Sequence, residues 1–183
     1  MPESGPGSGP LFTLDGVAPR IAADAWIAPT AAVIGDVEIG PQSNIWFHCV
    51  LRGDTNFIRI GARTNIQDGT ILHVDSGDCP CIIGDEVTVG HAAIVHACTL
   101  RSRAFVGMGA TVLDGAVIEE GGMLAAGGLL TPGKRIGPNE LWAGSPAKLL
   151  RLRPAEERAK FDRIATHYVE LAARFRAGLV RPG

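Results

Sequence analysis

The chain has 183 residues and a formal net charge of −2. This charge argues against nucleic acid or an anionic membrane as a partner, because both favour strongly basic surfaces. Glycine is abundant, with 24 residues, and aromatic residues make up only 5%. Many tight corners and few large core side chains favour a β-solenoid over a helical bundle or a sandwich.

Residues 1–10, MPESGPGSGP, are predicted to form a disordered tail. They lack the basic and apolar pattern of an export signal, and no apolar run in the chain reaches the roughly 18 residues of a membrane span. We therefore expect a cytoplasmic protein in which Cys49, Cys79, Cys81 and Cys98 are reduced thiols. Only one residue separates Cys79 from Cys81, which is closer than the usual spacing of a four-cysteine zinc site.

Residues 11–149 are predicted to form the solenoid, because aliphatic residues recur every six positions with three interruptions. The β-sandwich alternative has a period of two and does not produce this register. Three such hexapeptides make one triangular coil, and stacked coils bury a continuous aliphatic column. The chain is therefore expected to be an all-β solenoid, a parallel β-helix of hexapeptide repeats. The register runs through Ile21, Ile27, Val33, Ile39, Ile45 and Leu51, then Ile60, Ile66 and Leu72, then Ile83, Val89 and Val95, and finally Val106, Val112, Ile118, Leu124, Leu130, Ile136 and Trp142.

Residues 150–183 are predicted to contain a C-terminal α-helix that begins after Pro154 and ends at Gly178. We expect the helix to pack on the solenoid of its own chain or of a neighbour. A membrane-surface helix is the weaker alternative, because the polar face carries acids as well as bases. The apolar face comprises Phe161, Ile164, Ala165, Tyr168, Val169, Ala172 and Phe175.

The interruptions of the register decide where the histidines point. If the extra residues after Leu51 and after Leu72 form loops, Arg52, His73 and His96 occupy the same position of one face on successive coils. Side chains stacked in this way are about 4.8 Å apart, so His73 and His96 can share one metal ion.

Gln67 and His91 fall on a different face of the triangular coil. A single rod does not easily bring that face to a metal held by His73 and His96, whereas a neighbouring rod can. The third ligand is therefore predicted to come from another subunit of a threefold ring, with zinc as the first choice of metal by ligand type. An acyltransferase would need only one of these histidines, as a general base.

Several of these residues form a pattern that resembles the gamma-class carbonic anhydrases and their close homologues. The pattern consists of RGD at 52–54, NIQD at 65–68, His73 and H-x4-H at 91–96, and the resemblance covers about residues 11–175. It implies a left-handed β-helix with a C-terminal helix, assembled as a homotrimer with zinc or iron between subunits. The activity it implies is reversible hydration of carbon dioxide to bicarbonate by a metal-bound hydroxide.

The resemblance also implies roles for individual residues. His73 and His96 would bind the metal from one chain and His91 from the next. Gln67 would orient the metal-bound water or hydroxide, and Asn65 would help to place carbon dioxide or bicarbonate.

Four further residues would support this site by resemblance. Arg52 and Asp54 would form a salt bridge that supports the site and the subunit contact, and Asp68 would join these supporting residues. Tyr168 would reach the site from the C-terminal helix, although core packing explains this residue equally well.

The sequence departs from the family at the step that exports a proton. Thr55 stands where some members carry a glutamate, and the loop DSGDCPC offers Asp75 and Asp78 in place of a shuttle glutamate. Two alternatives therefore remain open. One is a hexapeptide acyltransferase or coenzyme A thioester hydrolase, and the other is a non-enzymatic trimeric assembly subunit.

Overall fold

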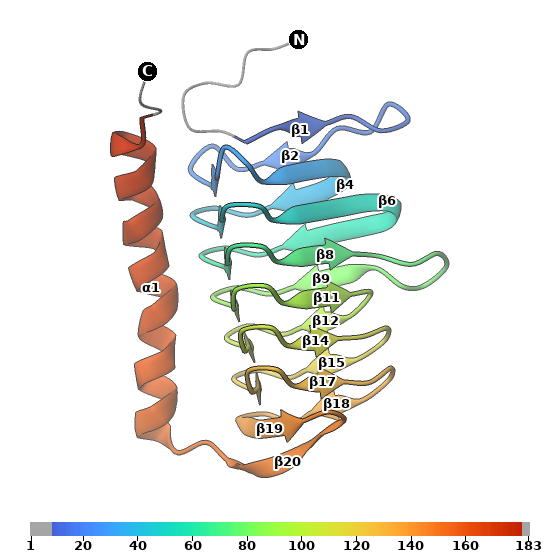
Figure 1. The fold of residues 1–183 in the computed structure, drawn as a ribbon, viewed down its shortest axis with the longest axis vertical. Helices are drawn as coiled ribbons and strands as arrows, with labels where there is room; N and C mark the ends of the chain where they lie inside the picture. Colours follow the sequence, from blue (N-terminus) through green and yellow to red (C-terminus); the bar gives the residue numbers. More distant parts are fainter. Residues whose placement is uncertain (1–8, 181–183) are drawn as a thin grey trace.

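The computed structural model describes residues 9–180 and shows a parallel β-solenoid flanked by one long helix (Figure 1). The tail predicted for residues 1–10 falls mostly on residues 1–8, which lie outside the described residues. The strands are β1 (Leu11–Phe12), β2 (Arg20–Ile21), β3 (Trp26–Ile27), β4 (Ala32–Ile39), β5 (Asn44–Ile45), β6 (Val50–Ile60), β7 (Asn65–Ile66), β8 (Ile71–His73), β9 (Cys81–Ile83), β10 (Thr88–Val89), β11 (Ile94–His96), β12 (Thr99–Leu100), β13 (Phe105–Val106), β14 (Thr111–Val112), β15 (Val117–Ile118), β16 (Met123–Leu124), β17 (Leu129–Leu130), β18 (Arg135–Ile136), β19 (Glu140–Gly144) and β20 (Ala147–Leu152).

Each coil contributes one inward aliphatic residue to each of three faces, which confirms the predicted architecture. These side chains are at most 4% exposed and fill the interior as continuous columns. In-register parallel pairing between coils fixes the columns. Face A contains Val33, Leu51, Leu72, Val95, Val112 and Leu130; face B contains Ile39, Ile60, Ile83, Leu100, Ile118 and Ile136; face C contains Ile27, Ile45, Ile66, Val89, Val106 and Leu124.

The structure corrects the predicted register at two places. Leu100 is fully buried on face B, only five residues after Val95, and the sequence register passed over it. The corner between them is one residue shorter than a hexapeptide allows, with Ala97 at a φ of 45°. The extra residues after Leu51 extend the continuous strand β6 and do not form a separate loop. There, residues 54–57 lie opposite Asp36 alone.

Helix α1 (Ala155–Gly178) has the predicted bounds and packs on face C of its own chain. Aromatic rings hold it there: Tyr168 meets Trp46 with ring centroids 5.3 Å apart, and Phe175 meets Trp26 at 5.7 Å. Among the described residues no helix is long and apolar enough to cross a membrane.

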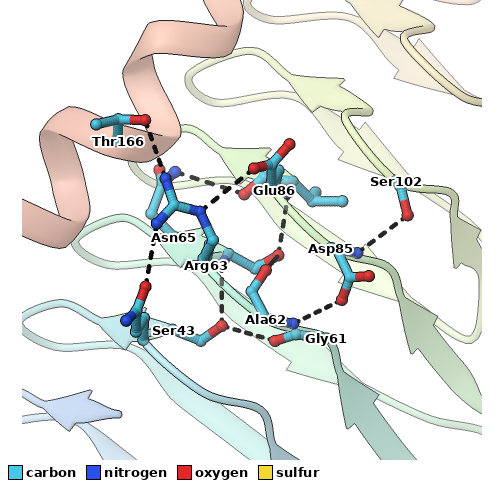
Figure 2. A network of polar contacts seen from close by, with 12 residues as sticks. Ser43, Gly61, Ala62, Arg63, Asn65, Asp85, Glu86, Ser102 and Thr166 are labelled. Carbon is cyan, nitrogen blue, oxygen red and sulfur yellow. Dashed lines mark hydrogen bonds and ion pairs between the residues drawn. The ribbon is translucent and has the colours of Figure 1, made fainter. Parts of the chain in front are cut away.

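Arg63 joins this helix to the solenoid (Figure 2). Its Nη2 donates to Thr166 Oγ1 at 3.0 Å, its Nη1 donates to Gln42 Oε1 at 3.0 Å, and its Nε contacts Glu86 at 3.3 Å. Arg63 lies at the corner between faces B and C, so this contact holds the helix over face C at that edge.

Candidate metal centre

The corner between faces A and B (the A–B corner) carries the predicted histidine stack. Strand pairing aligns Arg52 with His73 and His73 with His96 on successive coils. Because the preceding residue of each strand points into the core, these three side chains point outward. The prediction that these three residues occupy the same position on successive coils is therefore confirmed.

The two stacked imidazoles face each other closely. His73 Nδ1 lies 3.0 Å from His96 Nε2, and the ring centroids are 5.0 Å apart. The opposite nitrogen of each ring contacts a carboxylate: His73 Nε2 is 3.1 Å from Asp54 Oδ1, and His96 Nδ1 contacts Asp114 Oδ1.

These carboxylates decide what the pair of rings can bind. An ionised carboxylate only accepts hydrogen bonds, so each neutral imidazole donates its N–H to its aspartate. The two facing nitrogens then both carry lone pairs, and they repel unless a proton or a metal ion lies between them. Two ligands of one tetrahedral zinc ion are about 3.3 Å apart, close to the observed 3.0 Å, so the residues present fit a metal.

Asp54 is held in its ionised form. Partial burial disfavours the charge, but hydrogen bonds from the Thr55 backbone N–H, from His73 and from Arg52 outweigh it and lower the pKa of Asp54. The Arg52–Asp54 ion pair forms within one chain. It orients the carboxylate toward His73.

The corner between faces C and A (the C–A corner) carries the remaining predicted residues. His91 Nδ1 lies 2.9 Å from Asp68 Oδ2 in the coil above, and the His91 side chain is 43% exposed. Gln67 and Asn65 are buried beside them, with Gln67 Nε2 donating to Asn65 Oδ1 at 3.0 Å.

Tyr168 faces this same edge from helix α1. Burial, and secondarily the negative charge of Asp68, raise the pKa of its hydroxyl, so the phenol keeps its proton. Tyr168 also packs on Trp46. A packing role is therefore visible, whereas a contact with His91 is not.

One chain therefore holds two incomplete halves of the predicted site. The A–B corner gathers Arg52, Asp54, His73 and His96, and the C–A corner gathers Asn65, Gln67, Asp68, His91 and Tyr168. Among residues 9–180, no group of three or more histidine, cysteine or acidic side chains converges as a metal-binding cluster.

Asp114 is the residue that sequence reasoning missed. It lies at the A–B corner one coil below His96, as Asp54 lies one coil above His73. The available signal was positional, because both aspartates closely follow an inward face A residue, Leu51 or Val112.

The possible proton acceptors named from the sequence lie in the inserted segments of the A–B corner. The side chain of Asn56 donates to the backbone oxygens of Asp75, at 3.2 Å, and Gly77, at 2.7 Å, and so ties the second insertion to the first. Asp75 Oδ1 accepts a hydrogen bond from the Ser76 backbone. These contacts give the loop a structural role.

The cysteines are not candidate metal ligands of either half-site, although Cys49 Sγ donates to the Gln67 backbone carbonyl at 3.0 Å. All four are free thiols, as predicted, and Cys49, Cys81 and Cys98 are buried. Burial raises the pKa of Cys49 to about 12, and a hydrogen bond with Cys81 together with burial raises the pKa of Cys98. Protonated buried thiols are poor metal ligands.

Comparison with characterised proteins identifies close relatives. The chain is 49% identical over 159 residues to gamma carbonic anhydrase 2, mitochondrial, of Arabidopsis thaliana, covering 84% of this chain and 57% of that protein. It is 45% identical to a carbonic anhydrase of Geobacillus kaustophilus, covering 91% of each. The chain thus spans less than two thirds of the length of the plant relative. A scan against protein-family models finds no match.

Solved structures give the same architecture. A hexapeptide transferase family protein from Anaplasma phagocytophilum superposes with a TM-score of 0.87 at 48% identity, covering 90% of this chain and 97% of that one. The cytoplasmic location expected from the sequence stays a prediction, because the plant relative is named as mitochondrial.

Proposed function

This chain belongs to the gamma carbonic anhydrase family, and from that premise we propose that it catalyses the reversible hydration of carbon dioxide to bicarbonate at metal sites between subunits of a homotrimer. The observation that carries the proposal is the pairing of three histidines with three aspartates. Each of His73, His96 and His91 has one ring nitrogen at a carboxylate, which leaves its other nitrogen free to bind metal.

The aspartates act by fixing the tautomer and the orientation of each ring. Such carboxylates raise the basicity of the ligand and typically account for 10- to 100-fold of metal affinity, an order-of-magnitude range. A bound zinc or iron ion would supply Lewis-acid chemistry at this site. In carbonic anhydrase, zinc lowers the pKa of a bound water to about 7.

A threefold ring of parallel rods brings the two halves together. Rotation about an axis parallel to the rods preserves height, and His91 lies along the chain between the coils of His73 and His96. The His91 of a neighbouring copy therefore reaches the same level as the two stacked histidines. Zinc remains our first choice of metal because imidazole nitrogen suits it well, and iron is the alternative.

An apolar ridge on face A supplies the contact between subunits. Val50, Ile71 and Ile94 are in register on successive coils and point outward, and Ile71 and Ile94 are 44% and 41% exposed. The ridge lies between the two half-sites. Contact across it would cover exposed apolar surface and bring His91 of one subunit toward His73 and His96 of the next.

Gln67 is the residue placed to act on the substrate. Its Nε2 is held by Asn65, whose own Nδ2 donates to Thr88 Oγ1 at 2.8 Å. The amide is therefore fixed, and Oε1 remains available to accept a hydrogen bond from an attacking water and so to orient the lone pair of that water. Asn65 positions Gln67, and a direct contact of Asn65 with carbon dioxide stays a prediction.

A second candidate function is acyl transfer to or from a coenzyme A thioester. The Anaplasma relative, named a hexapeptide transferase family protein, favours it. This chemistry needs one histidine as a general base and does not explain three histidine–aspartate pairs.

Stopped-flow hydration of carbon dioxide on anaerobically purified protein, with metal content measured on the same sample, tests the proposal. We expect about one metal ion per chain, the stoichiometry of a threefold ring, and hydration above the buffer rate. A fully loaded protein without hydration would overturn the activity and direct the next assay to coenzyme A thioesters.

A further inference from the structure

A polar cavity lies at the coils that follow the stacked histidines, on a different corner of the solenoid and beneath the start of helix α1. It has a volume of about 520 Å³ and is lined by the first two turns of α1 and by corners between faces B and C. Volumes of this size are typical of small-molecule sites. Neither half of the metal centre contributes to its wall.

Two arginines in the wall have buried N–H groups without acceptors. Arg153 is 5% exposed; its Nη1 donates to the Gly121 carbonyl at 2.7 Å and its Nε contacts Glu157 at 3.3 Å, but Nη2 has no partner within residues 9–180. The Nε of Arg158 is likewise buried without a partner. Unsatisfied buried donors are uncommon in folded proteins and call for an explanation.

Carboxylates close by do not satisfy these arginines. Glu157 is shared between Arg153 and Arg151, while the Arg158 guanidinium donates, within the described part of the chain, only to the neutral oxygen of Asn139, at 3.0 Å. The lining side chains carry balanced formal charge, three arginines against Glu119, Glu120 and Asp162, so the donors left for a ligand are the unpartnered guanidinium N–H groups of Arg153 and Arg158.

The start of helix α1 adds further donors to the cavity wall. The N-cap of α1 is Pro154, which makes no side-chain capping bond, and Ala155 lines the cavity. The first-turn N–H groups and the helix dipole favour an anion at such a position.

The acids in the wall argue against a cation as the occupant. Glu119 is paired with Arg135 and Glu120 with Arg103. Asp162 is the single lining carboxylate without an ion pair in the described part of the chain. We propose that this cavity binds an oxyanion, a phosphate or carboxylate group, between Arg153, Arg158 and the first turn of α1. This site is independent of the proposed hydration activity.

Isothermal titration calorimetry of the full chain, with inorganic phosphate and bicarbonate in separate arms, tests the site. We expect saturable binding of at least one anion below about 10 mM. Arg158→Gln should weaken that binding about tenfold or more, since it removes a charge-assisted donor. Arg163→Gln removes the same charge from an exposed position of the same helix outside the cavity and should change nothing.

Asp162→Asn gives a prediction of opposite sign. Removing the unpaired carboxylate should tighten binding of the same anion. If Arg158→Gln does not fold, Arg103→Gln, on the opposite wall, replaces it and should also weaken binding.

His91→Ala separates this cavity from the metal centre, where oxyanions could also bind. Binding that persists in His91→Ala and weakens in Arg158→Gln supports the cavity. Binding that is lost in His91→Ala and unchanged in Arg158→Gln would overturn it, as would the absence of binding in both arms. Saturation by phosphate alone or by bicarbonate alone would each support the site and would identify which anion it prefers.

Discussion

The coils that carry the histidines and the coils below them share one backbone plan but differ in regularity. From Val106 to Ile136 every step between inward residues is six residues long. Between Leu51 and Leu100 the chain has two insertions and one shortened corner. The same outward position after the inward face A residue holds Ile34, Arg52, His73, His96, Leu113 and Thr131 in turn.

This contrast shows that the repeat provides equivalent outward positions on every coil, and that the candidate metal ligands occupy these positions only on the irregular coils. His73 and His96 occupy places that lower coils fill with Leu113 and Thr131. The insertion after Leu51 carries Asp54, which reaches His73. Departures from a local rule are where function is expected in a repeat protein.

His91→Ala should produce the largest effect, complete loss of the metal. In the proposed trimer every site loses one of its three histidine ligands. Met108→Ala is the matched control, since Met108 lies directly below His91 in the same corner, where the Gly109 N–H bonds the His91 carbonyl. Metal analysis by mass spectrometry measures both variants, and full occupancy of His91→Ala would refute the bridging role.

Core truncations compare the two regions for stability. Leu72 and Leu130 occupy the same inward column and are 0% and 1% exposed. Replacing either with alanine should lower the free energy of unfolding by about 2–5 kcal/mol, because each leaves a cavity. Urea unfolding measures this cost.

Metal affinity should separate the same two variants. Leu72 precedes His73, so Leu72→Ala should also weaken metal binding, whereas Leu130→Ala should not. Chelator competition on the folded protein measures affinity. Equal affinities would show that the histidine geometry does not depend on the local core.

The sequence predicted most of the fold because burial in a solenoid is periodic. A six-residue register fixes which residues point inward, so the positions of Arg52, His73 and His96 followed by counting. Leu100 escaped because a positive φ at Ala97 shortens one corner, and local backbone conformation is not visible in an aliphatic register.

Side-chain partners were harder to predict than positions. The separation of His91 from His73 and His96 followed from the faces, but Asp114 did not, because its contact with His96 depends on how far a corner side chain reaches into the next coil. The cavity under α1 was also invisible, since it depends on where the helix docks.

Asp114→Ala should weaken metal binding by about 10- to 100-fold without unfolding the protein, because His96 loses the acceptor that fixes its tautomer. Asp114→Asn keeps an oxygen acceptor and should recover part of that loss. Visible spectra of the cobalt-substituted protein report ligand geometry directly. Glu120→Ala, at a B–C corner, is the control; equal affinities of Asp114→Ala and this control would remove Asp114 from the site.

Glu157→Gln should have the smallest effect and tests the regular end of the molecule, where α1 is anchored. Burial disfavours the charge of Glu157, but hydrogen bonds and charges from Arg151 and Arg153 outweigh it and lower its pKa. A lowered pKa stabilises the fold at pH values above the ordinary glutamate pKa of about 4.3, and that contribution is lost as the pH falls through the folded-state value.

The free energy of unfolding of the wild type should therefore exceed that of Glu157→Gln by about 0.5–1 kcal/mol at neutral pH, the scale of a partly exposed ion pair. The difference should shrink as the pH falls below the ordinary glutamate pKa. Urea unfolding at neutral pH and at a series of lower pH values measures it, with Glu170→Gln, an exposed position of the same helix, as the control. A stability difference that persists at low pH would mean that Glu157 acts through packing. The anchoring of α1 would then be independent of charge, unlike the coils where His73, His91 and His96 pair with aspartates.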